Sequence, residues 1–181
     1  MRPVFLLLAG LAWCSHATPV TAQPFRVITR YRAYATPVVM DTLARPYDFA
    51  APIDSVHGAL LRAAERFKLK IDLDDRAQGL VGASRFTKVG SLGGERLSRY
   101  LHCGSGFGGP YADTYRLTLT VVALENRIGR DSTRVGFAMV GEGQTTEGNS
   151  SDPVACASSG VFELRWAQAV ARELGLPPPM P

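Results

Sequence analysis

Histidine and cysteine are scarce in this chain, and each occurs three times among 181 residues. Beyond the N-terminal region, the candidate metal ligands of these two types are Cys103, Cys156, His57 and His102. They lack the short paired spacings that are typical of zinc sites, such as two cysteines separated by two residues. We therefore expect that the protein holds no metal ion.

Long apolar runs are lacking after the N-terminus. The apolar run at residues 4–13 follows the positively charged Arg2 and is too short to span a bilayer. A more polar stretch then ends at residues 20–22 (Val-Thr-Ala), which have the small-residue pattern that signal peptidase cleaves. Residues 1–22 therefore predict a secretory signal peptide, and we expect no transmembrane segment in the cleaved protein.

A second interpretation of this leader starts from Cys14, because the signal of a lipoprotein also ends in a cysteine. Such signals carry a small residue directly before the cysteine, whereas this chain has Trp13 there. Cleavage after Ala22 is therefore favoured over lipidation. The expected location is the periplasm or the extracellular space, and association with a membrane is left open.

The rest of the chain has the length and composition of one globular domain. Residues 23–175 are expected to form it, and a proline-rich tail follows over residues 176–181. Hydrophobic residues make up 46% of the sequence, an ordinary fraction for a protein with a buried core. The net charge is +4, but the basic residues are scattered and do not form a stripe with aromatic residues. This distribution argues against a nucleic acid as partner.

Two cysteines, Cys103 and Cys156, remain after cleavage of the leader, an even number in an oxidising compartment. We expect them to form a disulfide that closes a loop of 53 residues. The chain-entropy model assigns such a loop a stabilisation of about 4 kcal/mol. This is a large share of the stability of a small domain.

Apolar periodicity predicts two helices, over residues 53–68 and 161–174. In the first, Val56, Leu60 and Phe67 recur at helical spacing while charged residues take the opposite side. Strands are predicted by β-rich or alternating segments over residues 25–34, 38–43, 69–73, 80–89, 115–125 and 133–143. Consecutive strands joined by short turns are antiparallel. The expected fold class is therefore α+β: a single twisted antiparallel sheet with two main helices packed on one face, a helix-grip-like arrangement.

A glycine-rich segment over residues 102–110 fits no regular element. Gly104, Gly106 and Gly109 match the spacing of the dinucleotide fingerprint. That fingerprint follows a strand and opens a helix, whereas these glycines follow a cysteine and precede Pro110. We therefore expect a tight loop and no cofactor.

A convergent set of catalytic residues is not evident. A nucleophilic cysteine needs a free thiolate beside a base, whereas Cys103 is expected to be paired in a disulfide. His57 lies within the first predicted helix, and we expect it to pack or to face solvent. No catalytic residue is assigned. A secreted hydrolase of unrecognised type stays as an alternative, which predicts a cleft that gathers His102, Asp113 and Glu95.

Residues 52–60 open the first predicted helix with a proline and an apolar residue, and residues 74–81 (DDRAQGLV) contain an Asp-Arg-x-x-Gly turn. This pattern of helix, strand, turn and strand resembles the unit that opens BamC-like envelope domains. The resemblance covers residues 52–81. It implies a helix-grip-like α+β domain of a lipid-anchored envelope family, and no functional residue is carried over from it.

These observations favour an exported, non-enzymatic domain of the cell envelope that acts by binding. The partner is expected to be another envelope protein, or a small ligand held between helix and sheet. The candidate contact surface consists of two aromatic residues, Phe107 within the glycine-rich segment and Tyr111 directly after it. A lid over the sheet is their alternative role. A lipid-anchored assembly module is a further alternative and depends on Cys14.

Overall fold

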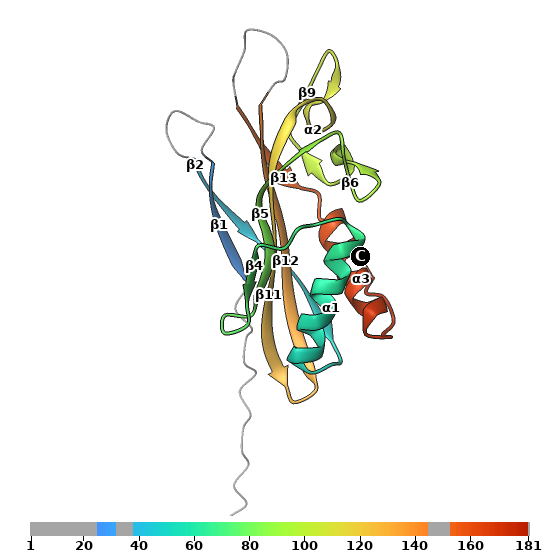
Figure 1. Cartoon of the computed structure of the whole chain (residues 1–181). Coiled ribbons are helices and arrows are strands. Elements are labelled where there is room, and N and C mark those ends of the chain that lie inside the picture. The colour runs from blue at the N-terminus through green and yellow to red at the C-terminus, as the bar shows by residue number, and fades with distance from the viewer. Residues whose placement is uncertain (1–24, 32–37, 145–152, 181) are drawn as a thin grey trace, which may run out of the picture.

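The computed structural model describes residues 25–31, 38–144 and 153–180. They form an α+β structure in which one main antiparallel sheet carries two helices that pack together against it, as Figure 1 shows. The predicted fold class is therefore confirmed. The predicted signal peptide and all but one residue of the predicted loop at 144–152 lie outside the described residues.

The main sheet has seven strands in the order β4-β5-β11-β12-β13-β8, and β3 pairs with β12 beside this path. These strands are β3 (Arg45–Phe49), β4 (Leu73–Asp75), β5 (Leu80–Val89), β8 (Leu101–His102), β11 (Arg116–Gly129), β12 (Ser132–Gln144) and β13 (Val154–Ser158). The centre of the sheet is the long hairpin of β11 and β12, because their alternating sequences form an unbroken ladder up to a bulge near the turn.

The sheet separates two cores of unequal size. Residues of β11 alternate between its faces, so Leu119 and Val121 face the helices while Val122 faces the other way. A hairpin of β1 (Arg26–Tyr31) and β2 (Val38–Leu43) lies on the side away from the helices (Figure 1). The small second core of Ala44, Val122 and Ala138 is packed there with partly buried residues that include β1's Val27.

Helices α1 (Ile53–Arg66) and α3 (Val161–Glu173) bury their apolar stripes between each other and the sheet. An aromatic cluster joins them, because the Phe162 ring lies 5.2 Å from that of Phe67 and 5.9 Å from that of Trp166. Such aromatic contacts add about 0.5–1.5 kcal/mol each beyond the area that they bury. Among the described residues, no helix is long and apolar enough to cross a membrane.

The prediction of a strand over residues 69–73 is largely wrong, because only Leu73 of that segment belongs to β4. Helix α1 ends at Arg66, and Lys68 adopts a left-handed conformation with φ of 54°. The amide of Leu69 then returns to the carbonyl of Ala64 at 3.2 Å. This helix ending takes Leu69 out of the predicted strand, while the amide of Asp72 donates to the carbonyl of Gly82 at 3.1 Å just before β4 begins.

Short elements connect β5 to β11 at the upper end of the sheet in Figure 1. They are β6 (Ser91–Leu92), β7 (Glu95–Arg96), the 3₁₀ helix η1 (Leu97–Arg99), β9 (Ser105–Gly106), β10 (Gly109–Pro110) and α2 (Tyr111–Thr114). Asp113 ties two of them together, because its carboxylate accepts the amide of Ser98 at 2.8 Å and the hydroxyl of Ser98 at 2.7 Å. The connection is thus held by specific polar contacts as well as by packing.

Candidate functional site

The glycine-rich segment contains a small hairpin, so the expectation that no regular element fits residues 102–110 is wrong. Strands β9 and β10 pair in antiparallel fashion, with Gly106 opposite Gly109 and Ser105 opposite Pro110. Gly104 and Gly109 have φ values of 83° and 105°, a conformation that costs a residue with a side chain about 1–2 kcal/mol. The glycines therefore serve the geometry of the hairpin.

The base of this hairpin is fixed by the disulfide Cys103–Cys156, as predicted. Cys103 directly precedes the hairpin segment, and Cys156 is a fully buried residue of β13. Their Cα atoms lie 4.2 Å apart, and the bond closes a loop of 53 residues. One end of the hairpin is thereby attached covalently to the main sheet.

Tyr111 packs against the β9–β10 hairpin and holds it to the rest of the domain. Its amide donates to the carbonyl of Gly104 at 3.0 Å, and its ring stacks on that of Tyr115 at 4.5 Å. The ring also lies directly against Gly106, where an added Cβ would come within 2.8 Å of the Tyr111 ring carbon Cε1. Tyr111 is half-buried and packs against the main core, so it connects the hairpin to the body of the domain.

Phe107 occupies the tip of the hairpin and is completely exposed, with a relative exposure of 117%. Its neighbours on both sides are the exposed glycines Gly106 and Gly108. The structure thus gives different places to the two predicted contact residues: Phe107 points into solvent, and Tyr111 packs beneath it. A lone aromatic ring on a fixed, glycine-flanked tip is available for contact with another molecule.

The residues proposed for a hydrolase cleft have other partners or are exposed. The carboxylate of Asp113 accepts a hydrogen bond from the hydroxyl of Ser98. Glu95 forms ion pairs with Arg99 at 3.0 Å and with Arg165 at 3.4 Å. His102 is exposed. Within the described part of the chain, no hydrogen bond or ion pair joins any two of His102, Asp113 and Glu95.

A buried polar cluster that the sequence did not reveal surrounds His57. This residue of α1 is 2% exposed. It therefore packs in the core, which is the first of the two positions expected from the sequence, and does not face solvent. Its Nδ1 lies 3.2 Å from Oε2 of Glu125 on β11, and its Nε2 lies 3.0 Å from Oδ1 of Asp74 on β4. The cluster therefore links α1 to two strands of the sheet.

Both ring nitrogens of His57 face a carboxyl oxygen, that of Glu125 on one side and that of Asp74 on the other. Burial raises the pKa of Glu125, although its hydrogen bond with His57 opposes this. Because both ring nitrogens are occupied and the ring is buried, the cluster is suited to joining elements and not to acting on a substrate.

Glu163 is a second buried carboxyl group with a structural task. It lies near the start of α3, and its Oε1 accepts the amide of Met139 at 3.0 Å. Met139 lies on β12 between the segments that pair with β3 and with β13, so no ladder partner reaches this amide. Burial raises the pKa of Glu163. The side chain therefore takes the place of a missing strand at the edge of β12.

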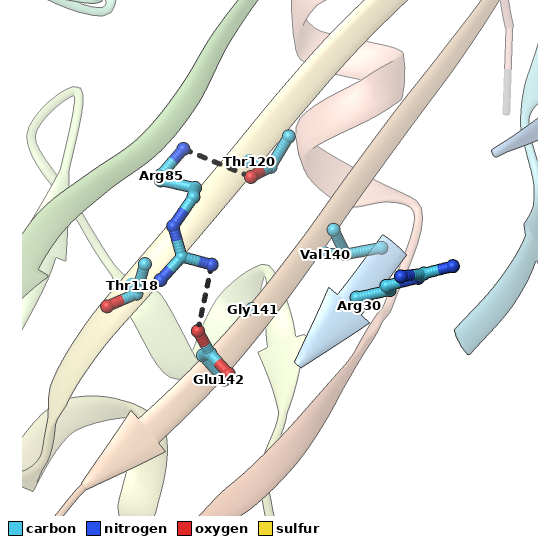
Figure 2. A pocket seen from close by; sticks show the side chains of 7 residues that line it. All are labelled: Arg30, Arg85, Thr118, Thr120, Val140, Gly141 and Glu142. Atoms are coloured by element: carbon cyan, nitrogen blue, oxygen red, sulfur yellow. Dashed lines mark hydrogen bonds and ion pairs between the residues drawn. The ribbon is translucent and has the colours of Figure 1, made fainter. Parts of the chain in front are cut away.

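A bulge in β5 places an arginine on the face of the sheet away from the helices, as Figure 2 shows. Arg85 has φ of 48°, and its amide donates to the hydroxyl of Thr120 at 3.1 Å. From there its guanidinium reaches across β11 to Glu142 on β12, with Nη1 3.3 Å from Oε1. Arg30 of β1 lines the same hollow. At about 10 Å³, this hollow has room for a water molecule and for no larger ligand.

Neither a metal site nor a similar known protein indicates which of these features is functional. Within residues 25–31, 38–144 and 153–180, no group of three or more histidine, cysteine or acidic residues is arranged to hold a metal ion. Comparisons of the chain with known protein families, with curated proteins and with solved structures find no match. The resemblance to BamC-like domains over residues 52–81 therefore stays a prediction, and function has to be argued from the geometry alone.

Proposed function

We propose that this chain is an extracytoplasmic binding domain that contacts a protein partner through the β9–β10 hairpin, with Phe107 as the anchor. The observation that carries the proposal is the combination of a fully exposed phenylalanine with a base fixed by the disulfide and by Tyr111. A hairpin whose base is fixed loses less backbone freedom on binding than a free loop, and exposed aromatic residues often dominate the energy of protein interfaces.

Two features support a location outside the cytosol. Residues 1–22 have the pattern of a secretory leader, and disulfides such as Cys103–Cys156 persist in oxidising compartments. Binding is favoured over catalysis because the buried carboxyl groups Glu125 and Glu163 hold structural contacts within the core. Neither is exposed enough to act on a ligand in solvent.

A protein partner is favoured over a lipid surface by the composition of the hairpin tip. Insertion into a membrane interface relies on several apolar side chains together with basic residues around them. Here the positions between Ser105 and Gly109 offer one apolar side chain, that of Phe107, and glycines beside it. A single ring is small for anchoring in a bilayer, but it suffices to fill one pocket on a protein.

A photo-reactive amino acid placed at position 107 of the exported protein tests this proposal in intact cells. The matched control places it at Ile128, an apolar residue that is 44% exposed near the turn of β11 and β12, at the opposite end of the sheet (Figure 1). We expect a discrete protein adduct from position 107 that position 128 does not give. The absence of an adduct at 107, or the same adducts at both positions, would overturn the proposal.

A further inference from the structure

A second feature of the molecule, separate from the hairpin, is an open groove where the C-terminal end of α1 meets the β6–β7 turn. Its volume is about 500 Å³, within the range of about 300–1,000 Å³ that is usual for sites of small ligands. The groove is lined by Arg66, Phe67, Lys68, Lys88, Ser91, Leu92, Gly93 and Gly94. Three of these residues are basic and none is acidic.

The charges of this groove, which we call the cationic groove, are largely uncompensated. Arg66 pairs with Glu173 on α3, with its Nε at 2.9 Å from Oε1, but Glu173 does not line the groove. Within the described residues, neither Lys68 nor Lys88 takes part in an ion pair. Two lysines without an ion pair therefore face this hollow, and an anion bound between them would offset their mutual repulsion.

Two unusual backbone conformations affect the groove: one at Lys68, which lines it, and one at Arg85, which lies outside it on β5. In the described chain, the non-glycine residues with positive φ are Lys68 and Arg85. Lys68 occupies the left-handed position after α1, where glycine is the preferred residue. A lysine at this position keeps a charge there but strains the backbone. Backbone strain of this kind is common among residues at binding sites.

Arg85 acts on the groove indirectly, through the bulge that it forms in β5. Before the bulge, Ala83 faces the helices; after it, Phe86 and Lys88 do, because the extra residue shifts the alternation by one position. Lys88 lies opposite Leu117, whose side chain belongs to the main core. Without the bulge, Lys88 would point to the other face of the sheet, away from Lys68.

The opposite wall is formed by the turn between β6 and β7. Gly93 and Gly94 have φ values of 58° and 83°. An added Cβ at Gly93 would lie 2.9 Å from Cδ1 of Phe67, so the turn packs closely on the end of α1. Phe67 and Leu92 are both buried and offer little apolar surface to a ligand, so recognition in the groove depends on charge.

We propose that the cationic groove binds a phosphate-bearing ligand. Cations from two chain segments, the end of α1 and β5, line the space, and a tetrahedral group with several charged oxygens offers an acceptor to each of the two unpaired lysines, Lys68 and Lys88. A planar carboxylate has two oxygens and is satisfied by a single arginine. The phosphate belongs either to a small soluble phosphomonoester or to the headgroup of an anionic lipid, which share this chemistry.

Binding is tested by titrating the exported protein at low ionic strength with glycerol 3-phosphate and, separately, with phosphatidylcholine vesicles that contain phosphatidic acid. Nuclear magnetic resonance follows the amides of Gly93 and Gly94 in the first case, and co-sedimentation measures the second. The variants are Lys68→Gln and Lys88→Gln, and the matched control is Lys70→Gln, which removes the same charge two positions away from Lys68 and outside the lining. Phe107→Ala separates this site from the hairpin.

We expect at least one probe to bind saturably. This binding should weaken about tenfold or more in K68Q and in K88Q, because each variant loses one charge-assisted hydrogen bond. K70Q and F107A should bind within twofold of the unmodified protein. Binding of glycerol 3-phosphate supports a soluble ligand, and binding of vesicles alone supports a lipid headgroup. If neither probe binds, or if K70Q weakens binding as much as K68Q, the proposal is wrong. A lower melting temperature of K68Q with unchanged binding would also overturn it, because it would assign Lys68 to the end of the helix alone.

Discussion

His57 Nδ1 and Glu125 Oε2 lie 3.2 Å apart in the core, and each side chain is 2% exposed. This bond joins the second turn of α1 to β11, the strand at the centre of the sheet. On its other side, the imidazole reaches Asp74, which is 48% exposed. One histidine therefore holds a helix, a central strand and an edge strand in a fixed relation.

Replacing His57 by alanine should lower the free energy of unfolding by about 3 kcal/mol or more. The change leaves the buried carboxyl group of Glu125 without its partner, and breaking a buried pair costs about 3–5 kcal/mol. Asp74→Asn is the control, and its effect should stay below about 1 kcal/mol because Asp74 is half-exposed. Urea unfolding measures both variants. Equal losses in the two would contradict the structural role assigned to the His57–Glu125 bond.

Glu163 makes stability depend on pH in a defined direction. Burial raises its pKa above the ordinary value of 4.5, so the folded protein binds this proton more tightly than the unfolded chain. The stabilisation is complete below the unfolded pKa and is lost as pH rises through the folded pKa. Glu163→Gln keeps an oxygen for the Met139 amide and carries no charge.

We therefore expect the free energy of unfolding of the unmodified protein to fall as pH rises above 4.5, and E163Q to fall less steeply over the same interval. Glu125 contributes in the same direction, because burial raises its pKa as well. Urea titrations at a series of pH values give both slopes. An E163Q slope equal to or steeper than that of the unmodified protein would rule out the assignment.

Removing both cysteines of the disulfide should destabilise the domain by about 4 kcal/mol, the loop-closure value for 53 residues. The variant Cys103→Ala/Cys156→Ala tests this by thermal or urea unfolding. Thiol labelling of the native protein is the direct check of the bond itself, and it should find no free thiol at these positions. Stoichiometric labelling of both cysteines would show that they are unpaired.

Lys68→Gly should raise stability and weaken anion binding in the same variant. Glycine relieves the left-handed strain at φ of 54°, which is worth about 1 kcal/mol. The substitution also removes one charge from the cationic groove. Differential scanning calorimetry and the phosphate titration provide the two readouts. A variant that is more stable and binds as well as the unmodified protein would show that Lys68 is dispensable for the groove.

Helices and long strands were predictable because their apolar patterns extend over many residues. The alternation in β5 and β11 and the helical spacing of Val56, Leu60 and Phe67 survive local irregularities. Strand β3 was missed because it contains Pro46, which is tolerated since β3 pairs on one side, with β12. Strand β13 was missed because its sequence, VACAS, is short and has little β-branched character.

The polar features were not predictable, because their members come together only in the folded chain. Asp74 and Glu125 are 17 and 68 residues from His57 in sequence. Nothing local marks any of the three as partners. The cationic groove depends on the bulge at Arg85, and a shift of one residue reverses the face on which Lys88 lies. By contrast, the disulfide was predictable from the even number of cysteines that follow the predicted leader.

The role of Phe107 as the anchor can be tested by one affinity measurement. Once the adduct from position 107 identifies the partner, isothermal titration calorimetry compares the unmodified protein with Phe107→Ala, Phe107→Trp and the control Ile128→Ala. Because Phe107 is fully exposed, F107A should change stability by less than about 0.5 kcal/mol. We expect F107A to weaken binding about tenfold or more, while F107W and I128A bind nearly as tightly as the unmodified protein. An affinity of F107A within twofold of the unmodified protein would contradict this role.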